Sequence, residues 1–198
     1  IGIKNIIIGC NAANGITTGQ SDENIAIGTY ALTGNASTTG NRNVAIGYGA
    51  FDAITTGACN VAIGENALGA STTGSQNIAI GRLALGGADT TGTDNIAMGT
   101  NSADAMTSGA CNIAIGYTAL SASTDGVGNI AIGRNALAVS DGDGDENIAI
   151  GTIAMGGADV SGAQNIAIGS TAMDALTSGA CNIGIGTDAL GSQTDGCS

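Results

Sequence analysis

One short pattern of apolar and polar positions repeats along this chain of 198 residues. The phrase Asn-Ile-Ala-Ile-Gly, with small variations, occurs eleven times, and successive copies begin 17 to 19 residues apart. The first and third residues after the asparagine, such as Ile78 and Ile80, are large and apolar, and a small residue such as Ala79 lies between them. Alternation with a period of two predicts a β-strand. The glycine that follows, such as Gly81, permits a sharp turn.

A second apolar pair follows each glycine within a few residues, as at Ala67-Leu68 and Ala84-Leu85. We expect a second, shorter strand there, and then a turn rich in Thr, Ser, Gly and Asp. A cycle of this length is one coil of a parallel β-solenoid, because equivalent residues of successive coils can stack at the strand spacing of about 4.8 Å. The sequence therefore predicts an all-β fold. Residues 1–198 would form a single repetitive β-solenoid, or β-roll, of about eleven coils.

The stacked positions would form ladders along the rod. We expect the Ile and Leu ladders to fill the interior, and the alanine of each strand to face outward, toward a neighbouring chain or solvent. The asparagines would form one column, whose amides either hydrogen-bond from coil to coil or suit a tight turn. This column comprises Asn5, Asn24, Asn43, Asn60, Asn77, Asn95, Asn112, Asn129, Asn147, Asn165 and Asn182. The small apolar content of one coil favours an oligomer.

The repeated pentapeptide, followed by x-x-Ala-Leu and Thr-Thr-Gly, resembles the YadA-like head repeats of trimeric autotransporter adhesins and the similar repeats of phage tail fibres. The resemblance covers essentially the whole chain. It implies a left-handed β-roll with three chains around a common axis, exposed on a bacterial or virion surface. It also implies binding of a host-surface receptor or glycan. It supplies no catalytic residue.

Charge and composition exclude other classes of function. Four basic residues oppose sixteen acidic ones, and the net charge is −12. A nucleic-acid partner is not expected, because backbone binding needs clustered Lys and Arg. No apolar run reaches the roughly 18 residues of a membrane helix, so no membrane insertion is expected in this segment. The chain has no histidine, and no nucleophile or phosphate-binding motif is evident. We predict neither enzymatic activity nor a required cofactor.

A few residues are candidates for specific contacts. Asp141, Asp143 and Asp145 alternate with glycine, which suits either a calcium site or a plain acidic turn. The ladder positions are committed to packing, so receptor contacts would fall on the variable turns. The candidate receptor contacts are Tyr30, Tyr48, Tyr117, Arg42, Arg82 and Arg134.

The cysteines leave several readings open. Cys59, Cys111 and Cys181 occupy one phase of the coil, separated by three and then four coils. That separation is too large for disulfides within the chain. Cys181 and Cys197 lie about one coil apart, so a bridge between them, cross-links between chains, and burial as small apolar residues all remain open. We favour burial.

The sequence as a whole predicts an extracellular structural or adhesive segment of a surface fibre, either a phage tail fibre or a bacterial trimeric adhesin head. Because the chain begins and ends inside a repeat, we expect it to be part of a longer fibre. One alternative is a self-assembling extracellular filament whose subunits stack end to end. A weaker alternative is an ice-binding solenoid, suggested by threonine pairs such as residues 55–56 and 72–73.

Overall fold

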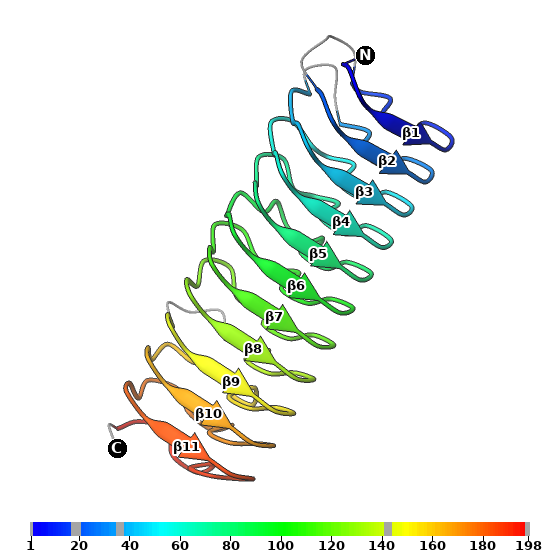
Figure 1. Cartoon of the computed structure of the whole chain (residues 1–198). Coiled ribbons are helices and arrows are strands. Elements are labelled where there is room, and N and C mark those ends of the chain that lie inside the picture. The colour runs from blue at the N-terminus through cyan, green and yellow to red at the C-terminus, as the bar shows by residue number, and fades with distance from the viewer. Residues whose placement is uncertain (1, 17–20, 35–37, 141–143, 197–198) are drawn as a thin grey trace.

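The computed structural model describes residues 2–16, 21–34, 38–140 and 144–196. Eleven parallel strands stack in chain order into one sheet, and the two termini lie at opposite ends of an elongated rod (Figure 1). This arrangement confirms the predicted all-β parallel β-solenoid. The strands are β1 (Ile6–Ile8), β2 (Ile25–Ile27), β3 (Val44–Ile46), β4 (Val61–Ile63), β5 (Ile78–Ile80), β6 (Ile96–Met98), β7 (Ile113–Ile115), β8 (Ile130–Ile132), β9 (Ile148–Ile150), β10 (Ile166–Ile168) and β11 (Ile183–Ile185).

The register is the same at every step of the sheet. Each strand residue pairs with its equivalent one coil later, as Ala79 does with Ala97. Each of these side chains therefore stands above the equivalent side chain of the neighbouring coil, at the strand spacing of about 4.8 Å. Every strand position becomes a column that runs the length of the rod.

The two faces of the strands are opposite to the sequence-based expectation. The alanine of each strand from β2 to β10 is fully buried, whereas the residues on either side of it are partly exposed or exposed. The interior of the coil is narrow, and the buried Leu or Met of the second apolar pair, such as Leu85, fills it from the opposite side. Between the strand and the Leu or Met side chains opposite it, there is room only for a side chain as small as the methyl group of alanine. The alanine column is therefore core, and the prediction that it faces outward was wrong.

The second apolar pair is not a strand in the part of the chain that the structure describes. At Asn66 and Leu68 the backbone φ is +52°, in the left-handed region, so the chain turns rather than extends. The pair still links the coils, because the Leu68 N–H donates to the Ala84 carbonyl oxygen at 3.0 Å. The left-handed residues on both sides of Ala67 bend the chain back under the strand, which explains how one coil closes in as few as 17 residues.

The glycine after each strand forms a column in which residues with a side chain are strongly disfavoured wherever a further coil stacks on it. Gly81 has a φ of +134°, which residues with a Cβ rarely adopt. A Cβ atom built there would lie 2.6 Å from the carbonyl oxygen of Gly99 in the next coil. The glycines thus allow both the corner and the close stacking of successive coils.

Candidate functional site

The most extended candidate surface is the outward face of the sheet. The first and third residues of every strand point outward and form two parallel rows of Ile, with Val at β3 and β4 and Met98 at β6. We call these two rows the isoleucine face. Neighbours in each row cover one another only in part, so the side chains remain half-buried or exposed along the whole rod.

The isoleucine face lies between polar columns. The residue before each asparagine is exposed in ten of the eleven coils and is usually charged or polar, as at Glu23 and Gln164. The fifth residue after each asparagine lies beyond the glycine corner and includes Tyr48 and Arg82. An apolar centre with a polar rim is the composition of protein–protein interfaces.

The asparagine column forms a buried hydrogen-bond ladder rather than an outward site. From Asn24 onward, the backbone N–H of each asparagine donates to the Oδ1 atom of the asparagine one coil earlier, at 2.8–3.0 Å. In nine coils, counted over the described residues, the Nδ2 atom also donates to a glycine carbonyl oxygen in the closing turn of its own coil, at 2.6–3.1 Å. The amides therefore fasten each strand both to the previous coil and to the end of its own coil.

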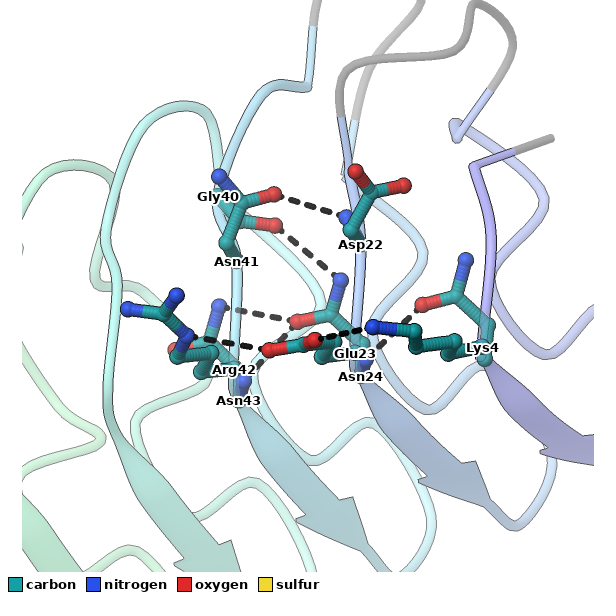
Figure 2. Close-up of polar contacts among 9 residues, drawn as sticks. Lys4, Asp22, Glu23, Asn24, Gly40, Asn41, Arg42 and Asn43 are labelled. Carbon is teal, nitrogen blue, oxygen red and sulfur yellow. Dashed lines mark hydrogen bonds and ion pairs between the residues drawn. The ribbon is translucent and has the colours of Figure 1, made fainter.

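An ion-pair ladder occupies the first three coils of the column that precedes the asparagines. Figure 2 shows the Glu23 carboxylate between Lys4 and Arg42, at 2.9 Å from Lys4 Nζ and 3.0 Å from Arg42 Nε. Hydrogen bonds from Lys4 and Arg42 hold the pKa of Glu23 below its usual value, and the same contact raises the pKa of Arg42. These three side chains are well exposed to solvent, so the ladder contributes little to stability.

The candidate receptor contacts divide among three columns. Arg42 belongs to the ion-pair ladder and is engaged by Glu23. The structure brings Tyr48, Arg82, Tyr117 and Arg134 together in one column on the other side of the isoleucine face. Tyr30 comes from the neighbouring column and packs edge-on against Tyr48, with ring centroids 5.9 Å apart.

The cysteines correct another expectation. Cys10, Cys59, Cys111 and Cys181 are free and exposed, so the favoured prediction of burial as small apolar residues was wrong for Cys59, Cys111 and Cys181. Three of them occupy the outward column before an asparagine, where the backbone has a φ of +61°. Cys197, and with it the proposed bridge to Cys181, lies outside the described residues.

The acidic loop gives no calcium site in the described part of the chain. Asp141 and Asp143 lie outside it, whereas the Oδ1 atom of Asp145 accepts the backbone N–H of Val127 at 2.7 Å. The described residues contain no group of three or more His, Cys, Asp or Glu side chains placed to hold a metal ion. Asp145 thus serves as a link between coils.

The threonine pairs also link coils. The hydroxyl group of Thr55 donates to the Thr72 carbonyl oxygen at 2.9 Å, and that of Thr107 to the Thr124 carbonyl oxygen at 2.9 Å. These two hydroxyl groups are therefore used between coils, whereas Thr56 and Thr73, the second residues of two threonine pairs, are exposed. Ice binding stays a prediction.

Two carboxylates near the closing turns are partly buried. Burial raises the pKa of Asp52 and of Asp104 above the usual value. A raised pKa in the folded state means that the charged form is disfavoured, so stability falls as the pH rises from the unfolded-state value of about 3.9 through the folded-state value.

We expect the double variant Asp52→Asn, Asp104→Asn to be more stable than the native chain at pH 7. The gain should be a few tenths of a kcal/mol per site, because both groups remain partly solvated. Urea unfolding at pH 7 and pH 3.5, at one protein concentration, would measure it. The gain should shrink at pH 3.5. The exposed Asp125→Asn variant is the control for the general loss of negative charge. An equal gain per site there would contradict the role of burial.

Comparison with known proteins identifies no relative. No family model matches the chain, and it matches no curated protein and no solved structure. The described residues contain no helix long and apolar enough to cross a membrane.

Proposed function

We propose that this chain is a structural and adhesive segment of an extracellular surface fibre, on a virion tail or a bacterial cell. It is a rod that carries contact residues for a host-surface receptor or glycan. Copies of the chain associate through the isoleucine face, and the resemblance to adhesin heads and tail fibres implies three copies. The function is mechanical and presentational, without catalysis.

The isoleucine face is the single observation that carries this proposal. Its two rows span eleven coils, or roughly 50 Å at the strand spacing. Two outward positions of one strand are about 7 Å apart. An apolar strip of this size is comparable to the largest exposed patches of monomeric proteins, roughly 300–600 Å², which are often functional.

A second copy of the same chain is the partner that fits this strip. It carries the same apolar rows at the same spacing along the rod, so side chains of two copies can interdigitate over the full length. Polar columns flank the strip on both sides and provide a rim. A compact globular partner would match the repeat over only a few coils.

We expect the purified chain to have a stable mass of three times 18.8 kDa in light scattering across a concentration series. Charging the centre of the strip with Ile113→Lys and Ile115→Lys should raise the dissociation constant at least about a hundred-fold, because two buried apolar contacts become charged. The matched control is Thr100→Lys with Thr152→Lys, which adds the same charge to the column beyond the glycine corner.

Each outcome separates the alternatives. A native chain that is monomeric at every concentration would overturn the proposed association. Equal dissociation in the control would show that added charge, not the isoleucine face, is responsible. A mass that grows without limit as concentration rises would favour the alternative of a filament whose subunits stack end to end.

A further inference from the structure

A column of exposed aromatic and basic side chains runs along the rod beside the isoleucine face. Its register is fixed by backbone hydrogen bonds, in which each carbonyl oxygen of the column accepts an N–H group from the next coil. The Tyr48 carbonyl accepts from Asn66 at 2.9 Å, and the Tyr117 carbonyl accepts from Asn135 at 3.0 Å. The column reads Cys10, Thr29, Tyr48, Glu65, Arg82, Thr100, Tyr117, Arg134, Thr152, Ser170 and Thr187. We call Tyr48, Arg82, Tyr117 and Arg134 the tyrosine–arginine edge.

The large side chains of this edge are directed to solvent. Tyr48 is 57% exposed and Tyr117 is 58% exposed. Two of the few aromatic side chains of this chain are thus directed to solvent rather than used in the core. Phe51, by contrast, is fully buried. Coil packing does not require these residues, because Thr, Ser and Glu occupy the same position in other coils with the same backbone bonds.

The two arginines of the edge have no acidic partner in the described part of the chain. Arg82 makes one long hydrogen bond, 3.4 Å from its Nη2 atom to Asn101 Oδ1, and no ion pair forms between Arg82 and Glu65 in the adjacent coil. Arg134 takes part in neither of the ion pairs found among the described residues. In a chain of net charge −12, this leaves two guanidinium groups available to an external anion.

The combination indicates the chemistry of the ligand. A tyrosine ring offers a flat apolar face and a polar tip, which suits a sugar ring. A guanidinium group binds a carboxylate through two parallel hydrogen bonds. Along the rod, Tyr48, Arg82 and Tyr117 are separated by two coils each, or about 10 Å, and Arg134 follows one coil later. A linear ligand that presents ring faces and carboxylates in turn would contact all four.

We propose that the tyrosine–arginine edge binds a linear acidic polysaccharide, with the tyrosine rings stacked on sugar rings and the arginines paired with carboxylates. The edge belongs to the polar rim of the isoleucine face, and the rim of an interface stays accessible to solvent, so the association of copies leaves the edge open to a ligand. This inference deepens the adhesive part of the proposed function and rests on it. A nucleic acid also combines anionic groups with flat rings, but its denser charge is opposed by the acidity of the rod.

Tyrosine fluorescence offers a direct assay, because the chain has no tryptophan and all three tyrosines lie at or beside this edge. We would titrate the full chain with oligogalacturonate, a hyaluronan fragment and oligomeric polysialic acid. Methyl-esterified oligogalacturonate is the uncharged control for the first probe. We expect saturable binding of at least one acidic probe, and at least ten-fold weaker binding of the ester, since the ester cannot accept the charge-assisted hydrogen bonds that a carboxylate forms with a guanidinium group.

Three variants locate the site. Arg82→Gln with Arg134→Gln, and separately Tyr48→Thr with Tyr117→Thr, should each weaken binding about ten-fold or more. Binding of the tyrosine variant would be followed by calorimetry. Arg42→Gln removes one positive charge from the other column and should change affinity less than about two-fold.

Failure of all three acidic probes to bind would overturn the inference, as would equal binding of the ester or an equal loss in Arg42→Gln. Tighter binding of a single-stranded oligothymidylate would point to nucleic acid instead. Light scattering on the same samples keeps the two proposals distinct. A trimer that binds no probe overturns only the polysaccharide site, whereas a monomer overturns the proposed association whether or not it binds sugar.

Discussion

A single methyl group added to the glycine column should disrupt the rod. We expect Gly81→Ala to lower the free energy of unfolding by on the order of 3–5 kcal/mol. Two costs combine, because alanine would adopt a φ of +134° and its Cβ would lie 2.6 Å from the Gly99 carbonyl oxygen. Residues 81 and 99 are both held by backbone hydrogen bonds to the previous coil, so neither can move without breaking the register. Urea unfolding followed by circular dichroism, at one protein concentration, would measure the loss.

The last coil provides a control that separates the two costs. Gly186 belongs to the same column and has a φ of +127°, yet a Cβ there would meet only the Ala189 methyl group, at 3.9 Å. Gly186→Ala should therefore cost only the backbone term, about 1–2 kcal/mol. If the two variants lose the same stability, close stacking of coils is not what demands glycine.

The second large effect concerns the asparagine ladder. Asn95 is buried, and its Nδ2 atom donates to Asn77 Oδ1 at 3.1 Å and to the Gly109 carbonyl oxygen at 2.8 Å. In Asn95→Asp, a carboxylate oxygen would face these two acceptors, and a charge would be buried without a cation. We expect a loss on the order of 4 kcal/mol at pH 7. The other Asp oxygen could still accept from Asn112, as Asn95 Oδ1 does.

The loss of stability in Asn95→Asp should depend on pH in a defined direction. Burial would raise the pKa of the introduced carboxyl, so the loss should be greatest above that pKa and should diminish as the pH falls below it. The protonated group can donate to the Gly109 carbonyl oxygen, which restores one of the lost bonds. Unfolding at pH 4 and pH 7 would measure the difference. Asn66→Asp, at a half-buried position in a turn two coils earlier, is the control and should show a smaller pH dependence.

The sequence predicted the architecture because the repeat is nearly uniform. Eleven copies of one phrase at nearly constant spacing leave few alternatives to stacked parallel coils. The asparagine and glycine positions were also evident, because each has a residue type with a specific backbone or amide role. The pattern could not distinguish the inner from the outer face of a strand, since alternation is symmetric about the strand axis.

The small volume inside each coil would have shown which face of the strands is buried. A coil of 17 residues encloses a narrow interior, which already receives a Leu or Met such as Leu85 from the opposite wall. Large side chains from both walls do not fit there, whereas Ala79 does. The same reasoning would have located the isoleucine face, which was the main surface that sequence patterns missed. The left-handed turn at Asn66 and Leu68 was less accessible, because leucine gives no local signal for a positive φ.

The sequential strand order also bears on how such a rod arises. Each strand pairs only with the strands just before and after it, so a finished coil is the template on which the next one forms. A coil can therefore be added or removed without creating a new kind of contact. The nine-residue phrase shared by residues 52–60, 104–112 and 174–182 fits lengthening by copied blocks. The reach of the rod and the chemistry displayed on its outer columns can then change independently over evolutionary time.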